Sequence, residues 1–268
     1  MATGREKLLY KKIVVLSVIL PVIGFFVLDL GLPYQRWMSI PVHAILETIG
    51  LTVGLIAALF LLSTNPGKQE IRSIFDWIAA ALIAMAVLDG FHAAVLPGNT
   101  AVWLHSMAAL TGGALFTSIW WGRHLGKKTP GYYIAGAVAL FAIVLGTASV
   151  AFPGIVPFIT VNTTFTLIAN GINATGGTLF VIAAAGFYFL SMKTEAREFL
   201  LFSVFCILNG LAGLFYPFTS SWTPAWWFWH IVRAAAYLLL LIVIYTIFIV
   251  PSRRGRTIFG NGDEETQG

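Results

Sequence analysis

The stretch from Val42 to Leu62, VHAILETIGLTVGLIAALFLL, decides the fold class because it is an almost unbroken apolar run. A transmembrane helix needs about 20 mostly apolar residues, and seven other runs in the chain also qualify. The eight runs cover residues 13–31, 41–63, 73–96, 102–121, 132–152, 174–192, 199–217 and 227–250. We therefore predict an all-α, polytopic transmembrane helical bundle of about eight spans, which forms one domain over residues 13–250.

The composition agrees with a chain whose solvent is the lipid bilayer. Hydrophobic residues make up 58% of the 268 residues and charged residues only 10%, whereas soluble domains carry about a quarter charged residues. The net charge of +5 comes from short basic clusters between apolar runs, so it does not indicate a nucleic-acid partner. The chain has a single cysteine, Cys206, which lies within an apolar run. Because no second thiol exists to pair with it, disulfides and cysteine-type zinc sites are excluded.

Basic residues predict the orientation. Lys and Arg gather at the N-terminus, in alternate loops and near the C-terminus, as Arg5, Lys7, Lys11, Lys12, Lys68, Arg72, Arg123, Lys127, Lys128, Lys193, Arg197, Arg253, Arg254 and Arg256. The positive-inside rule makes these segments cytoplasmic. We expect a cytoplasmic N-terminus over residues 1–12 and a disordered cytoplasmic tail over residues 251–268. His124 falls in one of these basic loops, where we expect a solvated residue.

Ionisable residues within the spans point to a functional site, because a charge in the bilayer is costly unless it is paired or used. Seven of them fall at one depth, in the outer half of the predicted bundle: His43, Glu47, Asp89, His92, His105, His230 and Arg233. The i,i+4 spacing of His43 and Glu47 puts both on one helix face, as does the i,i+3 spacing of Asp89 and His92. We interpret the set as one site rather than as separate packing contacts.

Three chemistries fit this set. A transition-metal site, holding zinc or copper, would take its ligands from His43, Glu47, Asp89, His92, His105 and His230. A b-type haem would need two of the same histidines on opposite helices, and the spacing does not select a pair. A small anionic or polar ligand could instead meet Arg233, with tryptophans such as Trp103 and Trp229 above it. Those tryptophans are also typical of an interfacial belt.

Two glycine pairs, in ALTGGALF (109–116) and NATGGTLF (173–180), lie inside predicted spans and follow no strand. They indicate close packing of helices rather than phosphate-binding loops.

Four segments together resemble the third class of bacterial membrane-associated sensor (MASE) domains. These are the early run with His43 and Glu47, then LDGFHAAVLPG (88–98), WLHSMAALTGGALF (103–116) and WFWHIVRAAAYLLLL (227–241). The resemblance implies an input module in a bacterial cytoplasmic membrane that senses a ligand, a metal or the membrane state from outside. Fewer than twenty residues follow the last span, so such a sensor would need a separate signalling or enzyme partner. A homo-oligomer is a further candidate assembly.

Two other functions compete with sensing. A metal-dependent intramembrane enzyme acting on a lipid-like substrate would use histidines to hold zinc and a carboxylate as general base. A metal or proton transporter would need polar groups along the whole bilayer, but the cytoplasmic halves of the spans are nearly free of ionisable residues.

Overall fold

The computed structural model describes residues 4–64, 68–122 and 131–245, and helices account for nearly all of them. Eight α-helices follow one another along these residues: α1 (Gly4–Gly31), α2 (Ile40–Ser63), α3 (Gln69–Ala94), α4 (Asn99–Gly122), α5 (Gly131–Ala151), α6 (Leu167–Thr194), α7 (Arg197–Phe215) and α8 (Pro224–Ile244). Each is long and apolar enough to cross a membrane. The chain is therefore an integral, multi-pass membrane protein, and the prediction of an all-α bundle of eight spans is confirmed.

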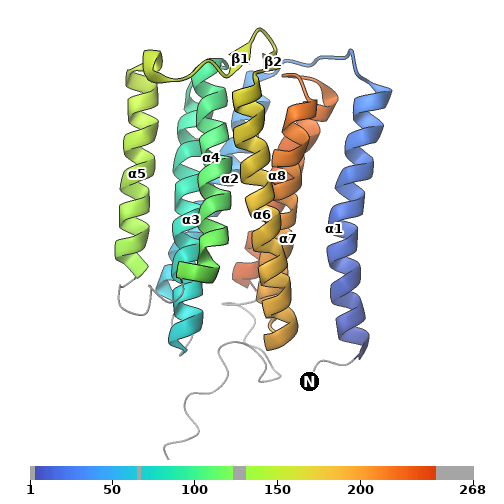
Figure 1. Cartoon of the computed structure of the whole chain (residues 1–268), viewed down its shortest axis with the longest axis vertical. Helices are drawn as coiled ribbons and strands as arrows, with labels where there is room; N and C mark the ends of the chain where they lie inside the picture. Colours follow the sequence, from blue (N-terminus) through green and yellow to red (C-terminus); the bar gives the residue numbers. More distant parts are fainter. Residues whose placement is uncertain (1–3, 65–67, 123–130, 246–268) are drawn as a thin grey trace, which may run out of the picture.

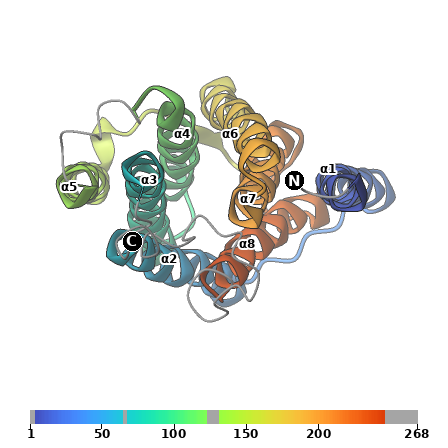
Figure 2. The ribbon, with the colours of Figure 1, turned by 90° about the horizontal axis from the view of Figure 1, so that it is seen from below.

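Six of the helices form a closed ring. Contacts run from α2 to α3, α4, α6, α7 and α8 in turn, and α8 packs back against α2. The remaining two helices lie outside the ring on opposite sides: α5 packs mainly on α3, and α1 packs on α7 and α8 (Figure 2). The arrangement leaves α1 and α5 to face lipid, since only 11% and 22% of their spans are buried, against 78% for α3 and 83% for α7.

Small residues bring α4, α6 and α7 close together, as the two glycine pairs predict. A Cβ atom added at Gly176 would lie 2.7 Å from the carbonyl oxygen of Ala109 on α4. One added at Gly177 would lie 2.7 Å from the carbonyl oxygen of Gly210 on α7. Both distances are too short for a side chain, so α6 touches both neighbours through backbone.

Most helix ends lie within about four residues of the predicted spans, and larger differences occur at three places. The α1 helix begins at Gly4 rather than at residue 13, so it also includes the basic segment that precedes the apolar run. The α6 helix begins at Leu167, seven residues before the predicted start, since Thr166 caps it and the Asn173 amide nitrogen finds hydrogen-bond acceptors inside the protein. The last helix is described only to Ile244. The predicted tail over residues 251–268 and His124 lie outside the described residues.

A short hairpin crosses one end of the bundle (Figure 1). Its strands, β1 (Thr160–Val161) and β2 (Thr164–Phe165), pair antiparallel, and a single 3₁₀ turn (Pro153–Ile155) precedes them. We call this end of the bundle the hairpin end. A second 3₁₀ turn (Tyr216–Phe218) follows α7 at the same end.

Asn99, at the start of α4, fixes the hairpin to the bundle. Its side-chain oxygen accepts hydrogen bonds from the backbone N–H groups of Ile159 (2.9 Å) and Thr160 (3.3 Å), and its amide nitrogen donates to the Pro157 carbonyl (2.8 Å). On the other side, the Ser221 N–H donates to the Thr163 carbonyl.

Candidate functional site: a histidine-lined cavity at the hairpin end

All four histidines of the described residues meet beneath the hairpin. His43 lies in the first turns of α2, His92 in the last turn of α3, His105 in the second turn of α4 and His230 in the second turn of α8. Because α2, α4 and α8 begin at this end and α3 finishes there, residues distant in sequence reach one depth. The four rings line a cavity of about 140 Å³, whose other walls include the hairpin and the Trp222, Trp226 and Trp229 rings.

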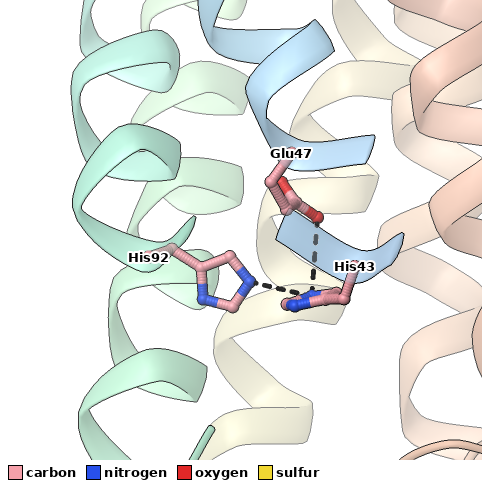
Figure 3. A group of neighbouring side chains, drawn as sticks. All are labelled: His43, Glu47 and His92. Atoms are coloured by element: carbon pink, nitrogen blue, oxygen red, sulfur yellow. Dashed lines mark hydrogen bonds and ion pairs between the residues drawn. The ribbon is translucent and has the colours of Figure 1, made fainter. Parts of the chain in front are cut away.

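Three of the imidazoles converge through the same ring atom. His43 Nε2 lies 3.1 Å from His230 Nε2 and 3.2 Å from His92 Nε2. Figure 3 shows the second of these contacts, with the Glu47 carboxylate reaching the same nitrogen of His43 from the next turn of α2. All three rings are buried. We call His43, His92 and His230 the imidazole triad.

Backbone carbonyls fix the tautomers of two members of the triad. His92 Nδ1 lies 2.7 Å from the Ala101 carbonyl oxygen, and His230 Nδ1 lies 2.8 Å from the Trp226 carbonyl oxygen. A carbonyl can only accept, so both Nδ1 atoms carry the ring proton. In the neutral rings, both Nε2 atoms therefore present lone pairs to His43.

The resulting contacts cannot all be hydrogen bonds. A neutral His43 has at most one proton on Nε2, and it can donate that proton to only one of its two neighbours. The other pair then brings two lone pairs face to face at hydrogen-bonding distance. A metal ion at the centre of the triad would remove this conflict, because it can accept a lone pair from each of the three Nε2 atoms, whereas one added proton satisfies only one of the two contacts.

Glu47 connects the triad to a deeper charged layer. Its Oε1 lies 3.5 Å from His230 Nε2 and 4.0 Å from His43 Nε2. Its Oε2 lies 3.4 Å from the guanidinium of Arg233. The carboxylate thus has one oxygen toward the triad and the other toward the fixed cation of the site.

Arg233 organises the deeper layer. Its guanidinium donates to Asp89 Oδ2 over 2.7 Å and to His105 Nδ1 over 3.0 Å. The Tyr237 hydroxyl, one turn further along α8, donates to the same Asp89 oxygen over 3.3 Å. Since arginine has no acceptor, His105 Nδ1 must be the acceptor, and the proton of the neutral His105 ring sits on Nε2.

Within the part of the chain that the structure describes, donor geometry offers two groups of side chains that could hold a metal ion: His43, Glu47 and His92, and also Glu47, Asp89 and His105. The second group already surrounds the guanidinium of Arg233, which supplies its positive charge. The first group has no guanidinium at its centre. His230 can join this group, because its Nε2 lies 3.1 Å from His43 Nε2 and 3.5 Å from Glu47 Oε1. We therefore place the candidate metal centre at the triad and Glu47.

Aromatic rings enclose the triad on the α8 side. The Trp229 ring stacks on His230 with centroids 3.6 Å apart, and the Trp226 ring lies 3.9 Å from the same imidazole. Trp222 has a φ of 71°, a left-handed conformation that is costly for a bulky residue and is often found near functional sites.

The predicted site residues fall into three groups. His43, Glu47, His92 and His230 form the triad with its carboxylate, whereas Asp89, His105 and Arg233 form the deeper layer. Trp229 lines the cavity, but the Trp103 indole lies toward α5, where it donates to Ser149 Oγ. Reasoning from the sequence missed Tyr237, although it follows Arg233 by four residues and must share its helix face.

A second, smaller polar cluster lies at the opposite end of the bundle. Arg72 Nε pairs with Asp76 over 2.9 Å, and its other nitrogens donate to the carbonyls of Leu62 and Thr64, which joins α3 to the last turn of α2. Glu198 is also buried near this end. Asp76 and Asp89 are 13 positions apart on α3, about 20 Å along a helix, and no ionisable residue lies between them on that helix.

Comparison of the chain with protein-family models, with curated proteins and with solved structures found no significant match.

Proposed function

We propose that this chain binds a divalent transition-metal ion, zinc or copper, at His43, His92 and His230 with Glu47, and that it acts as a sensory or binding module in the membrane. The main support for this proposal is the tautomer conflict in the imidazole triad. Because His92 and His230 each donate from Nδ1 to a backbone carbonyl, their Nε2 lone pairs both point at His43. Metal-binding histidines in proteins commonly donate their other ring N–H to a carbonyl or carboxylate, which orients the ring.

The nitrogen spacing supports a metal centre. Zinc binds imidazole nitrogen at about 2.0–2.1 Å, so two ligands lie about 2.9 Å apart at a right angle and about 3.4 Å apart at a tetrahedral angle. The observed separations of 3.1 and 3.2 Å fall between these limits. Glu47 Oε1, at 3.5 and 4.0 Å from two of the nitrogens, needs only a small movement to become the fourth ligand.

Haem fits this site less well. The two imidazoles that bind a haem iron lie on opposite sides of the porphyrin plane. Their iron-binding nitrogens are therefore about 4 Å apart. The His43 and His230 nitrogens are only 3.1 Å apart. The cavity of about 140 Å³ is also smaller than the roughly 300 Å³ or more of pockets that enclose drug-sized molecules.

Transport and lipid chemistry have less support than binding. In α3, the charged groups of the two ends are separated by apolar residues, whereas a transport path needs polar groups through the bilayer. The cavity is bounded by Pro97, Gly98 and Asn162 at the exposed hairpin end, and its small volume does not suit an acyl chain. The resemblance to membrane-associated sensor domains favours sensing, in a bacterial cytoplasmic membrane with the hairpin end outside and a separate signalling partner.

Metal stoichiometry tests this proposal. We expect the detergent-purified protein, incubated with zinc or copper and then freed of excess ion, to retain one ion per chain by elemental analysis. His92→Ala and His230→Ala should each lose it. The matched control is His105→Gln, because His105 Nδ1 faces Arg233 and a glutamine oxygen can replace that acceptor. Retention of metal by both alanine variants, or its loss in the control alone, would overturn the assignment.

A further inference from the structure

We propose that the site takes a second ligand, a small monoanion that enters at the hairpin end, binds the metal ion within the cavity and accepts a hydrogen bond from His105 Nε2. This inference rests on the proposed metal centre. The chemical class of the second ligand is a monoanion, and His105 is the residue that donates a hydrogen bond to it.

A divalent ion would leave the buried site with a net positive charge. Glu47 and Asp89 carry one negative charge each, and Arg233 carries one positive charge. With a divalent ion and neutral imidazoles, the site has one net positive charge at a place where Asp89, Glu47 and Arg233 are all buried. An uncompensated charge away from water is costly. A monoanion would make the loaded site neutral, whereas a neutral ligand would leave the charge in place.

The cavity has room for a small ligand beside the ion. The cavity of about 140 Å³ lies directly against the triad, since His43, His92 and His230 all line it. Its volume is several times the roughly 30 Å³ that a water molecule occupies in the liquid. It can therefore hold a ligand of a few atoms beside the ion, with Trp226 and Trp229 as its apolar walls.

His105 supplies a hydrogen-bond donor to the same cavity. His105 lines the cavity, and its ring centroid lies 5.3 Å from that of His92 and 6.1 Å from that of His230. Arg233 occupies its Nδ1, so the neutral ring keeps an N–H at Nε2 that is free of the triad. A donor placed beside the metal centre favours an anion over a neutral molecule of the same size.

The test uses the protein loaded with Co²⁺, whose visible absorption reports on the ligands of the ion, and azide as the monoanion. We expect azide to change the Co²⁺ absorption spectrum, and the change should saturate when one azide is bound per Co²⁺ ion. Acetonitrile, a neutral linear nitrogen donor of similar size, should bind at least tenfold more weakly. A spectrum that azide leaves unchanged, or equal affinity for acetonitrile, would overturn the inference while the bound Co²⁺ still supports the metal centre.

Variants of His105 test its assigned role. His105→Phe keeps a ring but removes the donor, so azide affinity should fall at least tenfold while Co²⁺ remains bound. His105→Gln keeps an acceptor for Arg233 and a donor for the cavity, and it should restore affinity to within about threefold of the starting protein. Unchanged azide affinity in a Co²⁺-loaded His105→Phe protein would contradict the assignment.

If His105→Phe does not fold, the contrast between azide and acetonitrile in the unmodified protein still decides whether the site prefers an anion. Failure of the unmodified protein to bind Co²⁺ would instead overturn the metal centre itself.

Discussion

Arg233 and Asp89 form a buried ion pair, with 2.7 Å between the guanidinium nitrogen and Asp89 Oδ2, which joins α8 to α3 across the ring of helices. Asp89 is fully buried, and Arg233 is 6% exposed. The pair does not stand alone, because the same guanidinium reaches Glu47 on α2 over 3.4 Å. One cation therefore balances two carboxylates from two other helices.

This arrangement predicts unequal effects of removing the partners of the pair. Arg233→Met leaves two buried carboxylates without their cation, and we expect it to lower the free energy of unfolding of the metal-free protein by about 3–5 kcal/mol. Asp89→Asn leaves Arg233 paired with Glu47, so its cost should be nearer to about 1.5–3 kcal/mol, typical of a lost hydrogen bond to a charged group. Denaturant titration in mixed micelles measures both values. Equal losses would contradict the sharing of Arg233 between the two carboxylates.

Glu47→Gln should separate metal binding from stability. Without metal, two carboxylates face one guanidinium, so removing one negative charge should leave the unfolding free energy unchanged or raise it. With metal, the loss of a charged ligand should weaken affinity by at least about 10–100-fold, the range seen when the outer partners of metal ligands are altered. Competition with a chelator gives the affinity, and micelle denaturation gives the stability. A variant that loses stability without losing metal affinity would assign Glu47 a packing role only.

The number of helices could be predicted from the sequence because bilayer thickness sets the minimum length of each apolar run. The start of α6 could not be placed, since Asn170 and Asn173 look unsuited to a span when read alone. The structure gives Asn173 partners inside the protein, Ser106 Oγ at 2.7 Å and the Ala169 carbonyl at 2.9 Å. Polar residues paired between helices are tolerated at membrane depth.

The membership of the site could be predicted from residue type and depth, but the division of labour within it could not. Counting turns puts all four histidines at one level and says nothing about which ring nitrogen faces which neighbour. That choice depends on contacts with the Ala101 and Trp226 carbonyls and with Arg233, all made after the helices pack. Trp103 shows the same limit, since its helix rotation directs it to Ser149 on α5.

Two glycines of α6 form a matched pair for testing close helix packing. A Cβ atom at Gly177 would lie 2.7 Å from the Gly210 carbonyl oxygen, whereas one at Gly171 would meet no atom within 4 Å. Gly177→Ala should force α6 and α7 apart and lower the unfolding free energy by about 1–3 kcal/mol, as overpacking does in cores. Gly171→Ala should be neutral or stabilising by up to about 1 kcal/mol, from helix propensity. Equal effects of the two substitutions would show that this contact does not limit stability.

The hairpin over the cavity should control how fast metal enters and leaves the proposed site. Asn99 holds the hairpin through three hydrogen bonds, and Thr160 of the hairpin lines the cavity. Asn99→Ala removes all three bonds without touching the triad, so both the loading and the release of metal should become faster by similar factors. The equilibrium affinity should then change less than threefold. Stopped-flow mixing with Co²⁺ and with a chelator gives the two rates, and Thr178→Ala on the exposed face of α6 serves as the control. Unchanged rates in Asn99→Ala would mean that metal reaches the triad by a route other than the hairpin end.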